Sequence, residues 1–82
     1  MTILEEAATI VGGSRKEIYG PPESEFPRMA KMWSLVLGTE ITAKQVCSCM
    51  IAMKLMRISV SPGHRDSLVD IAGFARILEM LE

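Results

Sequence analysis

The sequence predicts an all-α protein, a small four-helix bundle that is completed by oligomerisation. Apolar residues recur every three or four positions through most of the chain, as they do along one face of a helix. Glycine and proline gather between these segments, and nothing reads as a strand. At 82 residues the chain is one domain, residues 1–82, which can bury only about 60% of its unfolded surface. Oligomerisation is therefore expected.

The first helix is expected at residues 2–11, TILEEAATIV, where the apolar residues fall on one stripe and Gly12-Gly13 ends the helix. Residues 14–26, SRKEIYGPPESEF, contain a Gly-Pro-Pro turn and are expected to form the one substantial loop.

Helical spacing resumes from about Pro22 to Leu37, and Gly38 ends this second helix. Pro27 is compatible with a helix only in its first turn. The helix has a broad apolar face, formed by Phe26, Met29, Met32, Trp33, Val36 and Leu37.

The third helix is expected to begin at Thr42 and to run to about Ile58. Thr42 and Gln45 fit a capping box, in which each side chain bonds the other residue's backbone N–H. The helix is apolar nearly all round, which is typical of a helix buried on most sides. We expect it to be the central helix of the bundle or to lie at a subunit interface.

The fourth helix is expected from His64 to the C-terminus, after a turn at residues 59–64. At about 100° per residue, Asp66 and Asp70 fall within its apolar face. A buried carboxylate needs a partner. Lys54 and Arg57 on the preceding, antiparallel helix are expected to provide the partners, either as a purely structural ion-pair network or as part of a functional site.

The composition limits the function. Nine basic and ten acidic residues give a net charge of −1, so no general field favours duplex DNA. Cys47 and Cys49 point about 200° apart on a helix, which excludes a disulfide or zinc clamp between them and suggests small apolar residues in a reducing compartment. We find no signal peptide or membrane-spanning segment, so a cytoplasmic protein is expected.

Several cations and aromatic residues occur in segments that could converge at one end of a bundle. Arginine forks suit phosphate oxygens, a helix N-terminus favours an anion, and an aromatic ring can stack on a base. A phosphate-bearing ligand is therefore a candidate. The candidate ligand-binding residues are Arg15, Lys16, Tyr19, Arg28, Trp33, Lys54, Arg57, His64 and Arg65.

The ordered motifs of the chain resemble an uncharacterised family of small phage-encoded proteins. The matching motifs are ILEEA at 3–7, R-x-x-x-Y-G-P-P-E at 15–23, F-x-x-x-A-x-x-W at 26–33, G-x-E-I-T at 38–42, K-x-x-R at 54–57 and H-R-D-x-x-x-D-I-A-G-F-A at 64–75. This family in turn distantly resembles the MazG-type all-α nucleotide pyrophosphohydrolases, in which E-x-x-E and E-x-x-D carboxylates hold Mg²⁺ over a triphosphate.

The correspondence with the MazG-type metal site is partial. Asp70 matches the final aspartate of E-x-x-D, but Ser67 replaces the glutamate and Asp66 lies one position away. The helix that should carry E-x-x-E offers no acids between Arg28 and Val36.

These observations favour a non-catalytic protein that binds a nucleotide-type, phosphate-bearing molecule and needs no cofactor. In the host cytoplasm of a phage, such a homo-oligomer could sequester a nucleotide immune signal. The first alternative is a Mg²⁺-dependent nucleoside triphosphate pyrophosphohydrolase that uses Asp66, Asp70 and a glutamate. The second alternative is a protein-interaction module with a purely structural ion-pair cluster.

Overall fold

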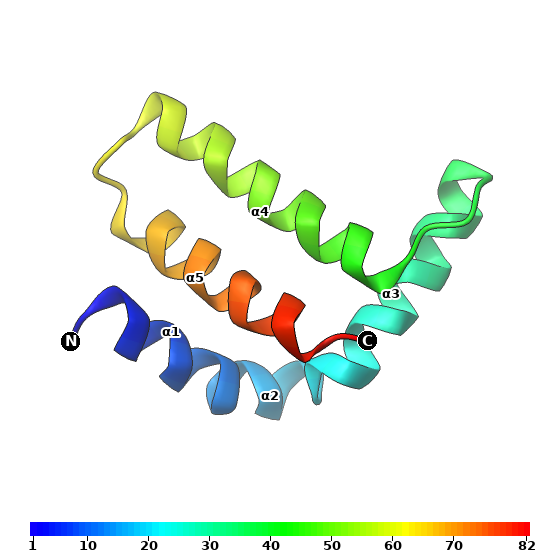
Figure 1. The fold of residues 1–82 in the computed structure, drawn as a ribbon, viewed down its shortest axis with the longest axis horizontal. Helices are drawn as coiled ribbons and strands as arrows, with labels where there is room; N and C mark the ends of the chain where they lie inside the picture. Colours follow the sequence, from blue (N-terminus) through cyan, green and yellow to red (C-terminus); the bar gives the residue numbers. More distant parts are fainter.

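The computed structural model describes residues 1–82, and each of its regular elements is a helix (Figure 1). The all-α prediction is confirmed. The four predicted helices correspond to α1, α3, α4 and α5, and a short additional helix, α2, follows α1. The helices are α1 (Ile3–Gly12), α2 (Ser14–Tyr19), α3 (Pro22–Leu37), α4 (Ala43–Val60) and α5 (Arg65–Met80).

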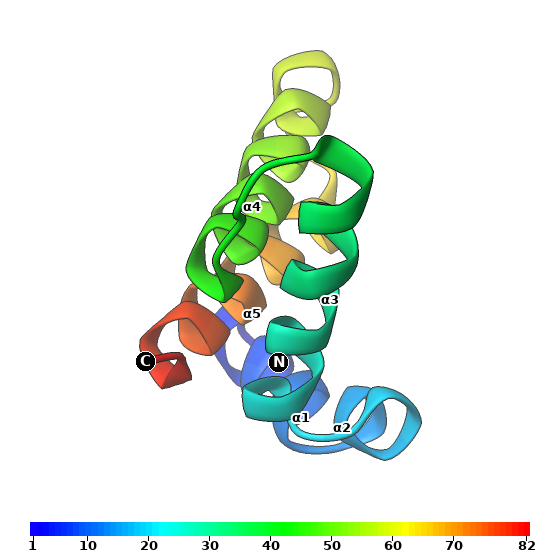
Figure 2. The ribbon, with the colours of Figure 1, turned by 90° about the vertical axis from the view of Figure 1, so that its right-hand side faces the viewer.

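The last helix, α5, lies at the centre of the fold. It packs between α1 and α4, which do not contact each other, while α3 crosses the end of the layer where α4 begins (Figures 1 and 2). The prediction that the third helix is central is therefore wrong, because α4 occupies one edge and fully buries only Val46 and Cys47. The expectation that α4 lies at a subunit interface stays a prediction.

Threonine caps begin two of the helices. Thr42 and Gln45 form the predicted capping box at the start of α4, and Thr2 and Glu5 form another at the start of α1. The two Thr2 hydrogen bonds, from its backbone and from its side chain, lower the pKa of the Glu5 carboxyl. Each capping box satisfies backbone N–H groups that the first turn leaves without partners.

Residues 14–19 form α2 instead of the predicted loop. Gly13 ends α1, and α2 begins directly after it. The carbonyl of Gly13 accepts a hydrogen bond from the backbone N–H of Glu17 at 3.0 Å. A Cβ on Gly13 would lie 2.8 Å from the carbonyl oxygen of Thr9, so this junction requires a glycine. The helix ends at Gly20, which has a φ of 82°.

α3 begins at Pro22, as predicted, so Pro27 lies in the second turn of the helix and not in the first turn, where a proline is compatible. Pro27 has no N–H to donate to the carbonyl of Glu23. Both residues are exposed, so water can reach that carbonyl. An interior proline is therefore tolerated here.

The core gathers buried residues from the starts of α3 and α4 and from the ends of α1 and α5. Phe26 is fully buried and packs edge-on against Phe74, with ring centroids 6.4 Å apart. Gly73 of α5 faces α1, and a Cβ there would lie 3.5 Å from the Cγ2 of Val11. The buried core cluster comprises Val11, Phe26, Ala30, Val46, Cys47, Ile77 and Leu81.

Candidate functional site

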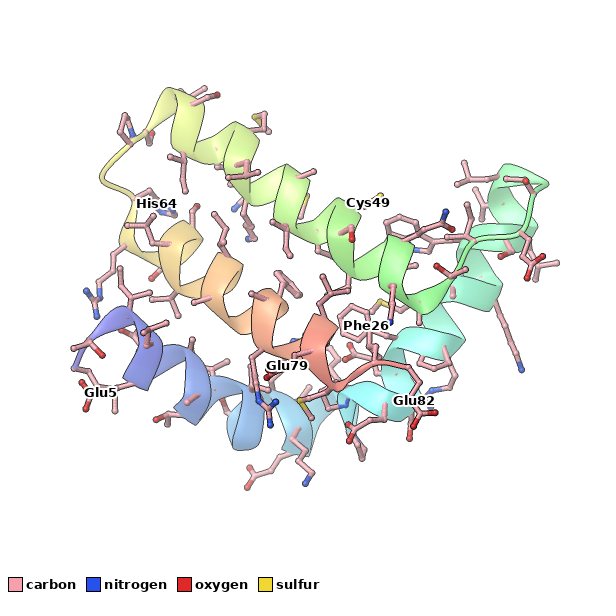
Figure 3. All side chains as sticks on the ribbon, in the orientation of Figure 1. Glu5, Phe26, Cys49, His64, Glu79 and Glu82 are labelled. Atoms are coloured by element: carbon pink, nitrogen blue, oxygen red, sulfur yellow. The ribbon has the colours of Figure 1, made fainter.

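The predicted cations do not converge at one end of the bundle. Arg15 contacts the ring of Phe74, whereas Arg65 lies nine residues earlier on α5, about 13 Å along the helix. His64 marks that far end of α5 in Figure 3, at the turn from α4. The expectation of a single cationic cluster is therefore wrong, because the chain places these residues in separate surroundings.

Arg15 is engaged within the fold. It forms an ion pair with the buried Glu25, and its guanidinium carbon lies 5.0 Å, 5.5 Å and 5.8 Å from the ring centroids of Tyr19, Phe26 and Phe74. A planar guanidinium stacked on rings and paired with a carboxylate satisfies its charge locally. The contacts of Arg15 and Tyr19 are thus those of a structural joint between α2, α3 and α5.

Arg28 and Trp33 also have partners within the chain. The Nη2 atom of Arg28 donates a long hydrogen bond of 3.4 Å to the carbonyl of Tyr19, next to Gly20. Trp33 is half-buried and packs against the core, instead of standing free to stack on a base.

Lys54 and Asp70 confirm the predicted contact between the third and fourth helices. The Nζ of Lys54 lies 2.9 Å from the Oδ2 of Asp70, and the side chain of Lys54 is only 13% exposed. Arg57 and Asp66 do not join this pair, because both are exposed and neither forms an ion pair. The predicted four-residue cluster is therefore a single pair.

The residues at the turn into α5 secure the helix. The Nδ1 of His64 lies 2.7 Å from the hydroxyl of Ser67, which is fully buried. Arg65 pairs with Glu6 of α1 at 2.9 Å and donates to the carbonyl of Met1 at 2.8 Å. Arg57 and His64 line a pocket of about 370 Å³ beside this turn.

A second pocket, which we call the Lys16–Arg76 pocket, combines two cations with an apolar lining. It has a volume of about 440 Å³, within the range of small-molecule sites. Lys16 comes from α2 and Arg76 from α5, so the two cations come from different helices. The other lining residues are Leu4, Ala7, Ala8, Val11, Gly12, Pro21, Pro22, Glu23, Ala72 and Met80.

Two cations and two carboxylates lie in or beside this pocket. Arg76 shares its charge with Glu79 through an exposed ion pair of 2.6 Å, and Glu23 contributes a carboxylate. The pocket also meets the N-terminus of the 16-residue α3 at Pro21 and Pro22, where the helix dipole is positive. Sequence reasoning missed Arg76, since only the fold shows that it shares a pocket with Lys16.

No three His, Cys, Asp or Glu side chains lie together in an arrangement that could hold a metal ion. Asp70 is paired with Lys54, and Glu6 is paired with Arg65. In addition, no helix has both the length and the apolar composition needed to cross a bilayer.

Comparison with known proteins places the chain among phage sequences. The family profile described as "Domain of unknown function (DUF6378)" matches residues 2–82. The chain belongs to the DUF6378 family. It is 39% identical over 80 residues to the "Gene 55 protein" of Mycobacterium phage D29, which covers 98% of this chain. It is 36% identical over 83 residues to the "Gene 55 protein" of Mycobacterium phage L5, which covers 100% of this chain.

This DUF6378 chain spans about half the length of the curated relatives it matches, 53% in each case. No solved structure shows significant similarity to it. The resemblance to a family of small phage proteins is thus confirmed, whereas the more distant MazG-like resemblance stays a prediction.

Proposed function

We propose that this protein binds a nucleotide-type, phosphate-bearing small molecule in the Lys16–Arg76 pocket and does not alter it chemically. The observation that carries the proposal is the pairing of two cations from different helices with an apolar lining in one 440 Å³ pocket. A nucleotide has the matching halves, since its base and sugar can contact apolar groups while its phosphates contact the cations.

The ends of the pocket suggest how such a ligand would lie. Ala7, Ala8 and Ala72 present small side chains from α1 and α5, which leave room for a flat ring. The positive end of α3 and the ammonium group of Lys16 would sit beside the phosphates. Glu23 limits how much negative charge the pocket accepts.

The role that we propose is sequestration. Because the relatives belong to phages, the protein would act in the host cytoplasm, where capturing a nucleotide immune signal without consuming it would help the infecting phage. The proposal thus treats the protein as a nucleotide sponge that acts as a homo-oligomer.

Thermal-shift screening against nucleotides and cyclic dinucleotides, with and without Mg²⁺, tests the proposal. A binder should be stabilised by at least one phosphate-bearing compound, because a ligand that binds only the folded state raises the melting temperature. Chromatography should then recover that compound unchanged. If no compound binds more tightly than millimolar, the proposal fails.

The same screen tests the pyrophosphohydrolase alternative. Mg²⁺-dependent stabilisation with release of monophosphate and pyrophosphate would establish an enzyme, and Asp70→Asn should then abolish turnover. Since one chain assembles no three metal-binding side chains, such a site would need acids from another subunit.

Protein association is a second candidate function, favoured by apolar side chains that no helix covers. Leu35 and Val36 near the end of α3 and Val60 at the end of α4 are each at least 78% exposed. Large exposed apolar patches often mark interaction sites. Pull-down from host lysate, set against self-association of the purified protein, would separate a host partner from a second copy of the chain.

A further inference from the structure

The outer face of α4 is uncharged and mostly apolar. At about 100° per residue, nine residues of this 18-residue helix occupy an arc of roughly 160° that points away from α5. The nearest charged residues on α4, Lys44 and Arg57, flank the arc on opposite sides. The residues of the arc, which we call the α4 outer face, are Gln45, Ser48, Cys49, Ala52, Met53, Leu55, Met56, Ser59 and Val60, all exposed.

The α4 outer face has the spacing of a helix-pairing seam. Gln45, Cys49, Ala52, Met56 and Ser59 follow one another at intervals of four and three residues, the a/d spacing of packed helices. Ala52 lies at the middle of this seam, where a small side chain lets two helix backbones approach closely. The methionines beside it adapt their shape to a facing surface.

The isolated chain is also more open than a closed domain of its size. Its accessible surface is 5417 Å², whereas about 4,850 Å² is typical of a 9.0 kDa monomer. Its radius of gyration is 13.1 Å, against about 11.7 Å for a compact domain of 82 residues. The excess surface of roughly 570 Å² approaches the roughly 800 Å² that each partner buries in a standard interface.

We propose that the α4 outer face binds the same face of a second copy of this chain, forming a two-fold symmetric dimer. A two-fold interface brings the same surface of both chains together. A charged residue in it would therefore lie close to the same charge on the partner chain, which is unfavourable. The α4 outer face has none. The exposed face of α3 suits this role less well, because it carries Arg28 and Lys31 among its apolar residues.

This dimer is independent of the proposed ligand site. No residue of α4 lines the Lys16–Arg76 pocket, whose walls come from α1, α2, α5 and the start of α3. Dimerisation through α4 would therefore leave both pockets open. A monomeric protein would remove the homo-oligomer from the proposed function but would leave ligand binding in the pocket standing.

Sedimentation equilibrium of wild type and three variants tests the dimer. Wild type should have twice the 9.0 kDa mass of one chain. Met56→Glu should be monomeric while keeping its helical circular dichroism, because it places a carboxylate in the seam at an exposed position. The matched control Ile18→Glu, an equally apolar exposed site on α2, should remain dimeric.

The contradicting outcomes are distinct. A wild-type protein that stays monomeric at the highest attainable concentration overturns the proposal. The α4 outer face would then bind a different protein. If Val36→Glu dissociates the dimer while Met56→Glu does not, the interface lies at the end of α3 and the proposal is wrong.

Cys49 provides a second readout that needs no substitution. It lies on the exposed side of α4 (Figure 3), while Cys47 is buried. Alkylation of Cys49 should slow about tenfold or more when the protein concentration is raised through the dimerisation range. At higher concentration more of the protein is dimeric, and the partner chain then covers the seam. Alkylation at the same rate at all concentrations would contradict the proposal.

Discussion

Lys54 of α4 and Asp70 of α5 form an asymmetric ion pair, with Nζ and Oδ2 2.9 Å apart and side-chain exposures of 13% and 38%. The lysine is thus the partner with less access to water. Because a charge that is stranded away from water costs more than one that can be solvated, the two halves of the pair should respond differently to neutralisation.

Asp70→Asn should lower the free energy of unfolding by about 1–2 kcal/mol, whereas Lys54→Met should cost less than about 1 kcal/mol. Urea denaturation of both variants and of the double variant measures the difference. Glu79→Gln, which breaks an exposed pair, is the control and should change stability by less than about 0.5 kcal/mol. Equal costs for the two single variants would contradict the asymmetry.

Arg15→Lys should destabilise the protein by about 1–2 kcal/mol, because a lysine keeps the charge but loses the planar stacking on three rings. Arg28→Lys is the matched control, since Arg28 makes only one long hydrogen bond. The melting temperatures of the two variants test this prediction, and only Arg15→Lys should lower the melting temperature. If Arg15→Lys reduced ligand affinity and left the melting temperature unchanged, Arg15 would be a ligand-binding residue, as its sequence position first suggested.

Gly73→Ala should stabilise the protein by up to about 1 kcal/mol, because alanine favours a helix interior more than glycine does. The added methyl group would meet Val11 at 3.5 Å, an ordinary contact distance. Thermal unfolding of the variant measures the gain. A loss of stability would mean that α1 and α5 pack more tightly than this distance implies.

Cys47 should resist alkylation in the folded protein, while Cys49 reacts. Burial raises the pKa of the Cys47 thiol above its ordinary value of 9.0, although nearby Arg15 partly opposes the shift. Because the folded state holds this proton more tightly, the resulting stabilisation is complete below pH 9 and is lost as pH rises through the folded-state pKa. Mass spectrometry after a maleimide pulse, at a protein concentration below the dimerisation range, should find one label in native protein and two in urea.

The helices could be predicted from local signals because their caps and breakers lie in the sequence itself. Thr42 and Gln45 identified the start of α4, and Gly38 identified the end of α3. The contact between Lys54 and Asp70 followed from a tight turn that makes α4 and α5 antiparallel neighbours. The position of α4 could not be predicted, since an apolar surface all round a helix is equally consistent with a centre and with a subunit interface.

The candidate site was harder to predict, because long-range packing decides which cations remain free. In the sequence, Arg15 looks available to bind a phosphate. In the fold it forms an ion pair with Glu25, ten residues later in the chain. Arg76 could not be singled out because no other cation lies near it in the sequence, and only the packing of α5 against α1 places it in the same pocket as Lys16.

The most direct test of the proposed function is isothermal titration of a nucleotide that stabilises the protein into wild type and matched variants. Lys16→Ala and Arg76→Ala should each weaken binding about tenfold or more, because each removes a charge-assisted hydrogen bond. Glu23→Gln should tighten binding, since it removes the only acid that lines the pocket, and Lys31→Ala, on the outside of α3, should have no effect. Unchanged affinity in Lys16→Ala and Arg76→Ala, together with loss in Arg57→Ala, would contradict the account and move the ligand to the turn between α4 and α5.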